Sequence, residues 1–334
     1  MMAGVTLLLS GSDLERSLDI GACTQALRQG FLAVPSGITA QRVRTDLPGP
    51  GTATVLIPGL VDGVPAYSVK VNAKFPTARP ALRGVVCLHD AGTGELLAVL
   101  DSATVTAWRT GLSAALATHV LARPSASAVA VIGAGTQSGL VLRGLAALRG
   151  WERLTVCDLD TGRAGVFAVR HSAAAATAAT QAAASAASAA SAASVADPRD
   201  AARDADIVVL ATWSRTPLLD AGDVLPGTHV TSLGADEPGK AELTPALLTA
   251  GRLFVDDVPL ALTAGALGTA ALSAAAATGT LGQVLDGTIP GRLTDADITI
   301  YTPVGLPWQD LAVAWAAYRN ARAAGLGREF DFLA

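Results

Sequence analysis

The stretch that decides the fold is Ala128-Val129-Ala130-Val131-Ile132-Gly133-Ala134-Gly135-Thr136-Gln137-Ser138. Its apolar first half predicts a buried strand, and a helix is expected over residues 136–149, directly after the glycines. Gly133 permits a tight turn, and Gly135 lets the backbone approach a ligand closely. A helix that begins at such a turn presents unpaired N–H groups to an anion. The stretch therefore predicts a dinucleotide site that holds a pyrophosphate.

The rest of this cofactor site is expected around the loop. We predict contacts from Gly133, Gly135, Thr136 and Gln137, and from Ser138, which replaces the usual third glycine and whose hydroxyl is expected to donate to a phosphate. Asp158 follows the next expected strand, where a carboxylate can accept both ribose hydroxyls. An acid at that place repels a 2′-phosphate and favours NAD over NADP.

Strands and helices alternate after residue 127. Continuous apolar strands between helices predict a parallel sheet covered on both faces, which is a doubly wound α/β domain. The expected strands are 128–132, 154–157, 207–211, 230–233, 253–255 and 298–301. Residues 1–120 are expected to be mixed α and β, with a hairpin of strands 85–89 and 96–101 and then a helix capped by Ser102. A helix over 308–324 is expected to pack on that first domain.

Composition narrows the possible partners. The formal net charge is −4, and 51% of the residues are hydrophobic, much of that share being alanine. Such a balance argues against a nucleic-acid-binding surface. The N-terminus shows no signal peptide or membrane span, so a cytoplasmic location is expected. The histidines show no metal-ligand spacing, and no metal is expected. Residues 173–196, almost entirely Ala, Ser and Thr, are expected to form a long exposed helix or a partly disordered insert without a function.

Further motifs lie on both sides of the glycine loop. They are Arg42-Val43-Arg44-Thr45, Ser68-Val69-Lys70-Val71, Val105-Thr106-Ala107-Trp108-Arg109-Thr110-Gly111, Gly234-Ala235-Asp236-Glu237-Pro238-Gly239-Lys240, and Val304-Gly305 with Gln309-Asp310-Leu311. With these motifs the chain resembles, over nearly its whole length, the ornithine cyclodeaminase and mu-crystallin family, which also contains alanine dehydrogenases and ketimine reductases.

The resemblance implies a substrate site. Residues that match Arg44, Lys70 and Arg109 hold the substrate's α-carboxylate beside the nicotinamide, and cations, above all the planar fork of arginine, suit a carboxylate taken out of water. Lys70 lies in an apolar run, where burial near other cations would lower its pKa and let it relay a proton. Asp236 matches an acid that is catalytic in the cyclodeaminases. A helix-capping role for Asp236 is the alternative.

Family position adds three cofactor contacts: Thr110, Ser214 and Lys240, with a surface role for Lys240 equally open. The resemblance also implies a homodimer built through the first domain and the C-terminal helix. We therefore expect a Rossmann-type doubly wound parallel sheet over residues 121–304, plus a mixed α/β substrate-binding and dimerisation domain over 1–120 and 305–334.

The chain departs from the ornithine enzymes at one informative position. Val55 stands where they carry a glutamate that holds the distal amine, and valine cannot bind an ammonium. The leading hypothesis is ornithine cyclodeaminase-like chemistry, in which NAD(H) serves hydride transfer at the α-carbon of a small amino or imino acid and the product is proline or a homologue. The alternatives are an NAD(P)H-dependent ketimine or imino acid reductase or alanine dehydrogenase-like enzyme, and a non-catalytic mu-crystallin-like binding protein.

Overall fold

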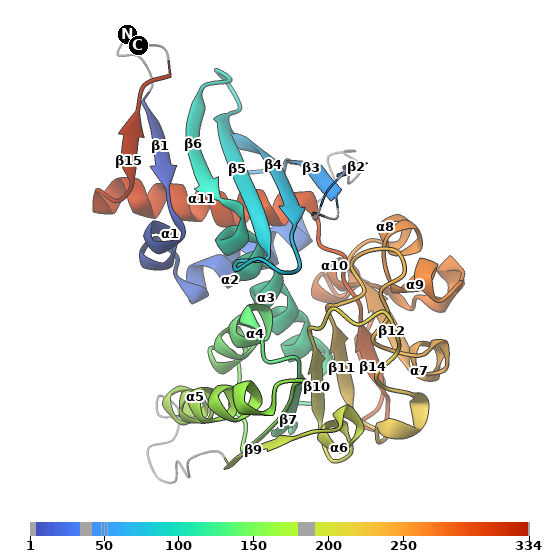
Figure 1. Cartoon of the computed structure of the whole chain (residues 1–334). Helices are drawn as coiled ribbons and strands as arrows, with labels where there is room; N and C mark the ends of the chain where they lie inside the picture. Colours follow the sequence, from blue (N-terminus) through green and yellow to red (C-terminus); the bar gives the residue numbers. More distant parts are fainter. Residues whose placement is uncertain are drawn as a thin grey trace. The chain divides into compact units, whose positions relative to one another are not determined.

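The computed structural model describes residues 5–33, 42–47, 49, 51, 53–179 and 191–332. The chain divides into two compact units (Figure 1): unit 1 is Met1–Thr110 with Leu306–Ala334, and unit 2 is Gly111–Gly305. Helix α3 (Ser102–Leu121) begins in unit 1 and ends in unit 2. The predicted fold class, a doubly wound parallel sheet with a mixed α/β partner, is confirmed.

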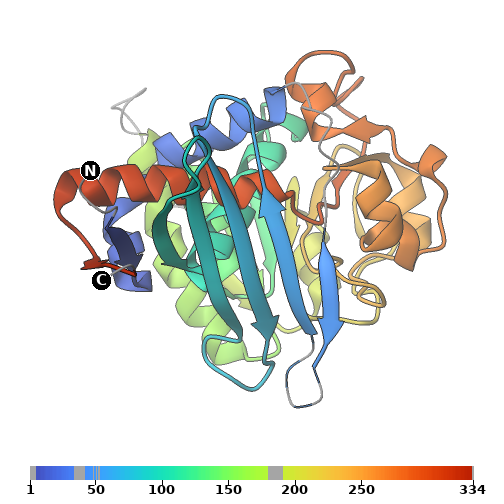
Figure 2. The same ribbon diagram turned by 90° about the horizontal axis from the view of Figure 1, so that it is seen from above.

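The described strands of unit 1 form a seven-stranded sheet in the order β15-β1-β6-β5-β4-β3-β2 (Figure 2). β1 runs parallel to β6, and all other neighbours are antiparallel. The predicted hairpin is confirmed as β5 and β6. The strand bounds are β1 Thr6–Leu9, β2 Val43–Asp46, β3 Ala53–Gly59, β4 Ala66–Lys74, β5 Leu82–Asp90, β6 Leu96–Asp101 and β15 Arg328–Phe330.

Helices cover one face of this sheet. They are α1 (Gly11–Ser17), α2 (Ile20–Leu32) and α11 (Pro307–Ala324). α11, the predicted C-terminal helix, packs on α1, α2 and strands β3 to β5. In β4 the side chains alternate between buried and half-buried, as expected for a strand with only one covered face. Among the described helices of the chain, none combines the length and apolarity needed to cross a membrane.

The described strands of unit 2 form one parallel sheet in the order β13-β12-β14-β11-β10-β7-β8-β9. From β7 the chain builds outward through β8 and β9, and then returns to the other side of β7 with β10. Ligands of open α/β sheets bind where the strand order reverses, at the carboxyl ends of the strands. The bounds are β7 Ala128–Ile132, β8 Arg153–Cys157, β9 Ser191–Val195, β10 Ile207–Leu210, β11 His229–Ser232, β12 Arg252–Val255, β13 Gly279–Thr280 and β14 Thr299–Tyr301.

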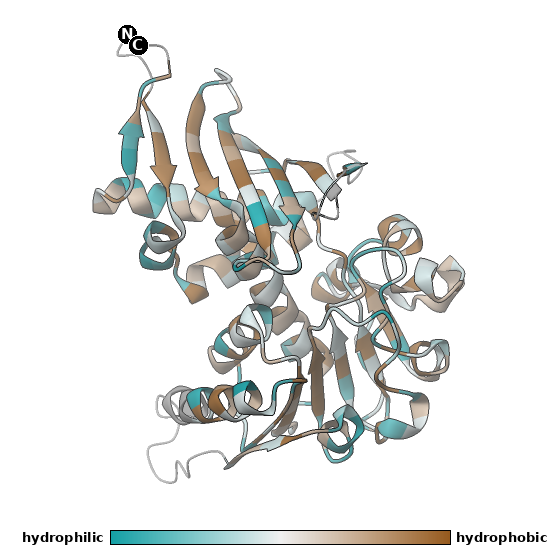
Figure 3. Ribbon diagram, in the orientation of Figure 1, coloured by the Kyte–Doolittle hydropathy of each residue, from teal (hydrophilic) through white to brown (hydrophobic). Residues whose placement is uncertain are grey.

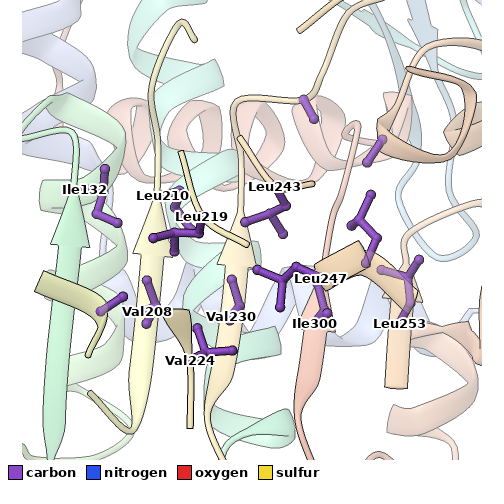
Figure 4. Close-up of a cluster of buried hydrophobic side chains, with 14 of the residues drawn as sticks. Ile132, Val208, Leu210, Leu219, Val224, Val230, Leu243, Leu247, Leu253 and Ile300 are labelled. Atoms are coloured by element: carbon purple, nitrogen blue, oxygen red, sulfur yellow. The ribbon is translucent and has the colours of Figure 1, made fainter. Parts of the chain in front are cut away.

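Both faces of this sheet are buried. Successive residues of β7 and β10 alternate between two apolar clusters: Val129 and Val131 belong to one, Ala130 and Ile132 to the other. Figure 4 shows the second cluster, and Figure 3 shows the apolar central strands. The helices of unit 2 are α4 Thr136–Ala146, α5 Thr161–Ala179, α6 Pro198–Ala202, α7 Pro245–Ala250, α8 Val258–Thr263, α9 Ala266–Thr269, α10 Leu281–Leu285, and the 3₁₀ turns η1 Ala221–Asp223 and η2 Ala274–Ala276.

Two local expectations are wrong. Within the alanine-rich segment 173–196, α5 continues to Ala179, residues 180–190 lie outside the described residues, and Ser191–Val195 form strand β9 rather than helix or insert. β9 pairs with β8 at the sheet edge, where small side chains suffice. Ser102 is the first residue of α3 and not its cap, because Asp101 Oδ2 accepts the Thr104 N–H at 2.8 Å.

A buried histidine closes a hydrogen-bond chain at the amino end of β11. Thr299 Oγ1 donates to the Leu121 carbonyl, so it accepts from His229 Nδ1. His229 Nε2 then accepts from Thr231 Oγ1, which lies 2.8 Å from the Thr118 hydroxyl. Burial, helped by nearby arginine charges, lowers the pKa of His229 to about 3. The folded chain therefore keeps this imidazole neutral.

We expect His229 to make the chain less stable as the pH falls. The unfolded chain takes up a proton below pH 6.5 that the folded chain refuses until about pH 3, so the free energy of unfolding drops between these values by up to about 1.4 kcal/mol per pH unit. His229→Gln should be less stable than wild type at pH 7, with the difference shrinking toward pH 4 in urea unfolding. A difference that stays constant with pH would contradict this role.

Candidate active site

The glycine loop lies between β7 and α4, at the point where the strand order reverses. Gly133 has φ +97°, and its N–H donates to the Cys157 carbonyl at 2.8 Å. A Cβ on Gly133 would lie 2.6 Å from the Ala211 carbonyl oxygen, which follows β10. Both the positive φ and this contact require glycine, because any side chain would push β7 and β10 apart.

The reason for a glycine at position 135 differs from the reason at position 133. A Cβ on Gly135 would meet no atom of the described residues within 4 Å, so their packing does not demand glycine there. Gly135 is the N-cap of α4, and no side chain in the described part of the chain caps that helix. The first-turn N–H groups, among them those of Thr136 and Gln137, have no carbonyl of their own helix to bond. Open space above an uncapped helix N-terminus fits a bound pyrophosphate.

Ser138 differs from its predicted use. Its side chain is fully buried, and its hydroxyl donates to the Gly133 carbonyl at 2.5 Å. A hydroxyl has one proton to donate, so it does not serve a phosphate. Ser138 instead closes the glycine loop from inside, through its hydrogen bond to the Gly133 carbonyl.

Asp158 follows β8, as expected, and both of its carboxylate oxygens bind the chain. Oδ2 accepts the Ala134 N–H of the glycine loop at 2.7 Å, and Oδ1 accepts the Asp160 N–H at 2.9 Å and Arg163 Nη2 at 2.5 Å. Burial opposes the charge of Asp158, but these donors outweigh it and hold its pKa below the usual value. Asp158 therefore stays ionised and steadies the glycine loop.

The predicted Asp236 and Lys240 form an ion pair in unit 2. Lys240 Nζ lies 2.9 Å from Asp236 Oδ1 and 3.7 Å from Glu237 Oε1, and it sits 5.0 Å from the centre of the Trp213 ring. Lys240 is buried, so the surface role left open for it is wrong. The Ser214 hydroxyl donates to the Thr216 carbonyl at 2.6 Å, which closes a turn after β10.

Glu242 was missed by the sequence reasoning. It is fully buried, and its carboxylate accepts the Thr212 N–H and hydroxyl, the Ser232 hydroxyl and the Gly234 N–H, all at 2.6–2.7 Å. Burial raises the pKa of Glu242. These contacts tie together the loops that follow β10 and β11. No motif marked this residue, because a single acid between Ala241 and Leu243 is typical of an exposed position.

A cavity of about 330 Å³ lies in unit 2, beside the loop that carries Lys240 and Glu242. The polar part of its wall comes from Lys240, Glu242, Ser232 and Arg215, and most of the rest comes from alanine and leucine side chains. The cavity places buried charge next to Asp236 at the carboxyl end of the sheet, where a ligand of this fold class binds.

In unit 1, a buried carboxylate gathers two of the predicted cations. Lys70 Nζ lies 2.5 Å from Asp310 Oδ2 and 3.4 Å from Thr106 Oγ1, and Arg109 Nε lies 3.3 Å from Asp310 Oδ1. Only 1% of the Lys70 side chain and 2% of the Asp310 side chain are exposed. β4 supplies Lys70, α3 supplies Arg109 and Thr106, and α11 supplies Asp310. Asp310 lies in the Gln309-Asp310-Leu311 motif, and the sequence does not mark it as a site residue.

The electrostatics of this cluster favour an exchangeable proton on Lys70. Burial lowers the pKa of Lys70 to about 7, although the charge of Asp310 opposes the shift. The charges of Arg109 and Arg42 lower it further. Burial also disfavours the charge of Asp310, but Lys70 and Arg109 outweigh it and hold the pKa of Asp310 below its usual range. This direction agrees with the lowered pKa expected for Lys70.

Gln309 adds a buried hydrogen-bond donor, its side-chain amide nitrogen, to this cluster. Its Oε1 accepts the Leu306 N–H at 3.2 Å and lies 3.5 Å from Arg109 Nη1, while its buried Nε2 has no hydrogen-bond partner among the described residues. A buried amide donor normally finds an acceptor. Two cations that share one carboxylate, next to this donor, make an arrangement that can bind an anion.

Arg44, the third cation predicted to bind the substrate, lies apart from this cluster. Arg44 is exposed, and its guanidinium binds Asp46 Oδ1 at 2.8 Å, so the structure does not bring Arg44 to Lys70. Arg42, which the sequence reasoning passed over, acts on Lys70 through its charge, as Arg109 does. The buried Thr110 hydroxyl has no hydrogen-bond partner among the described residues, as a ligand-binding hydroxyl would. Val55 pairs with Arg44 and Asn72 across the sheet.

Comparison with known proteins bears on both the glycine loop of unit 2 and the cluster around Lys70 and Asp310 in unit 1. Residues 5–325 match the model of the ornithine cyclodeaminase/mu-crystallin family. An alanine dehydrogenase of Archaeoglobus fulgidus is 32% identical over 262 residues, which are 76% of this chain and 75% of that protein.

Two solved structures are similar over nearly their whole length. An archaeal alanine dehydrogenase dimer with bound NAD has a TM-score of 0.86 and 27% identity, covering 98% of this chain and 100% of that one. Thermococcus litoralis Δ1-pyrroline-2-carboxylate reductase in complex with NADH and L-proline has a TM-score of 0.86 and 26% identity, covering 97% and 99%. These likenesses identify NAD(H) as the cofactor that the glycine loop fits.

We expect Gly135→Ala to weaken NADH binding without harming the fold. The methyl group would enter the open space above the loop, so the dissociation constant of NADH should rise at least about tenfold, while the free energy of unfolding changes by less than about 0.5 kcal/mol. Nicotinamide fluorescence and urea unfolding measure the two effects. Gly222→Ala, also in open space, is the matched control. Unchanged NADH binding in Gly135→Ala would contradict the placement of the pyrophosphate.

Proposed function

The chain belongs to the ornithine cyclodeaminase/mu-crystallin family of NAD(H)-dependent enzymes, and we propose that it reduces a small 2-imino acid to the amino acid and runs the reverse oxidation. The carrying observation is the buried cluster of Lys70, Arg109 and Asp310 with the Gln309 amide nitrogen, which has no hydrogen-bond partner among the described residues. The names of the relatives, alanine dehydrogenase and pyrroline-2-carboxylate reductase, agree with this activity.

The cluster suits the α-carboxylate of the substrate. Lys70 and Arg109 bring two positive charges against the single carboxylate of Asp310, which leaves room for a second anion. The side chain of Arg109 has further N–H groups for a carboxylate, and the Gln309 amide donates from beside them. Arg44 would join this set only after leaving Asp46.

Reduction of an imine also consumes a proton at nitrogen. NADH, when bound, supplies the hydride for the α-carbon. Lys70, with a pKa of about 7, exchanges a proton readily near neutral pH and is the donor that we assign to this step. Asp236 is the second group that we assign to proton handling, and the ion pair with Lys240 orients its carboxylate.

Cyclodeamination of ornithine is the second candidate, because Asp236 matches the acid that the resemblance gives to the cyclodeaminases. Val55 argues against it, since an ornithine side chain carries an ammonium that valine cannot bind. A pKa of about 7 suits Lys70 for proton transfer, which the non-catalytic alternative does not require. We therefore place the reductase first.

The reductase and the cyclodeaminase hypotheses differ in their net reaction, because only the reductase consumes NADH. We expect the wild-type enzyme to oxidise NADH with a small 2-imino acid such as Δ1-pyrroline-2-carboxylate, with kcat/KM falling as the pH rises through about 7 because Lys70 loses its proton. Lys70→Met should lose at least about 100-fold in kcat/KM while still binding NADH. Nicotinamide absorbance follows the reaction. Ammonia release from ornithine without a net change of NADH would instead establish the cyclodeaminase.

We further propose that the chain forms a homodimer through the uncovered face of the unit 1 sheet. One apolar row lies on that face. Across neighbouring strands, Val43 of β2 pairs with Leu56 of β3, Leu56 pairs with Val71 of β4, and Val71 pairs with Val85 of β5. Val43 is 58% exposed, Leu56 40% and Val85 39%. An exposed apolar row is typical of an interface, and the similar alanine dehydrogenase is a dimer.

We expect Val85→Asp to produce monomers. A carboxylate at the β5 end of this row would lose its water on association, which raises the dissociation constant by about 100-fold or more. Size-exclusion chromatography with light scattering gives the mass. Leu293→Asp, at a 65% exposed leucine of unit 2, is the control and should leave the mass unchanged. If Val85→Asp has the same mass as wild type, the interface lies elsewhere.

A further inference from the structure

Arg163 lies where the adenosine end of the cofactor is expected. It belongs to the first turn of α5, and its Nη2 donates to Asp158 Oδ1 at 2.5 Å. The Asp158 side chain is 5% exposed and that of Arg163 52% exposed, so the carboxylate is covered while half of the guanidinium faces solvent. The pair thus presents its cation outward.

This pair alters the usual discrimination between the two nicotinamide dinucleotides. An acid at the end of the second strand accepts the ribose hydroxyls of NAD, and its charge repels a 2′-phosphate. Here both oxygens of Asp158 already accept hydrogen bonds, from Ala134, Asp160 and Arg163. Arg163 also compensates the negative charge of Asp158. The repulsion that Asp158 would exert on a 2′-phosphate is therefore weakened, and the charge of Asp160 also acts on Arg163.

The guanidinium also has donors to spare. Arginine carries five N–H groups, and within the described residues the side chain of Arg163 makes one hydrogen bond, to Asp158. Its exposed edge can bind a phosphate while the contact with Asp158 persists. Leu159, between the two acids Asp158 and Asp160, is fully exposed. A leucine in open solvent beside this pair offers an apolar surface that a bound adenine would cover.

We propose that Arg163 determines cofactor specificity in this chain: it neutralises Asp158 and binds the 2′-phosphate, so that NADP(H) is accepted as well as NAD(H). The assignment concerns the adenosine end of the cofactor only. It rests on dinucleotide binding and not on the identity of the amino or imino acid.

Binding alone tests the proposal, without a substrate. We expect wild-type protein to bind NADPH within about tenfold of NADH by nicotinamide fluorescence, and to bind adenosine 2′,5′-bisphosphate by calorimetry. In Arg163→Ala, NADPH affinity should fall at least about tenfold and bisphosphate binding should be lost, while NADH affinity stays the same or improves because Asp158 is freed for the ribose. Arg163→Lys should retain part of the NADPH affinity.

Arg203→Ala is the matched control, since Arg203 is another exposed arginine of unit 2 in an ion pair, with Asp200. It should leave the affinities for NADH and NADPH unchanged. Two results would overturn the proposal: NADPH affinity that is the same in wild type and Arg163→Ala, or an equal loss of NADH and NADPH affinity in Arg163→Ala, which would make Arg163 a mere tether of α5. A failed imino acid assay would affect neither measurement.

Discussion

The buried contact between Lys70 and Asp310 is the interaction on which unit 1 depends. It joins β4 to α11 across 240 positions of the chain, with both side chains almost wholly out of water. Removal of Asp310 would leave the cations of Lys70 and Arg109 buried without their carboxylate, and loss of one partner of a buried pair typically costs about 3–5 kcal/mol. Burial lowers the pKa of Lys70 against the opposing charge of Asp310, and Asp310 also holds Arg109 nearby, so one buried carboxylate both fixes the C-terminal helix and prepares an anion site.

Unit 2 uses buried carboxylates in a related way. Glu242 binds the loops after β10 and β11, and Asp158 binds the glycine loop after β7. Each accepts backbone N–H groups that would otherwise be unsatisfied at the ends of the strands. The loops that must face a cofactor are thereby held in place before it binds, which reduces the ordering that binding requires.

The fold could be predicted because its signals are local. Apolar runs, the two glycines and the alternation of strands with helices are all readable along the chain, and the doubly wound sheet and the β5–β6 hairpin follow them. β9 could not be predicted, because alanine and serine carry no strand signal and the pairing with β8 supplies the whole preference. The candidate site was predicted in part: Lys70 and Arg109 come together, whereas Arg44 binds Asp46 instead.

By itself, therefore, the sequence determined the glycine loop, the family resemblance, the cation positions and the apolar Val55. Tertiary structure decided what each charge does. It turned Ser138 inward to the Gly133 carbonyl, brought Asp310 and Gln309 to the cations, and paired Asp158 with Arg163. The physical reason is that a residue's type fixes its possible charge and hydrogen bonds, while its burial and its neighbours, often far away in the chain, decide which of these are used.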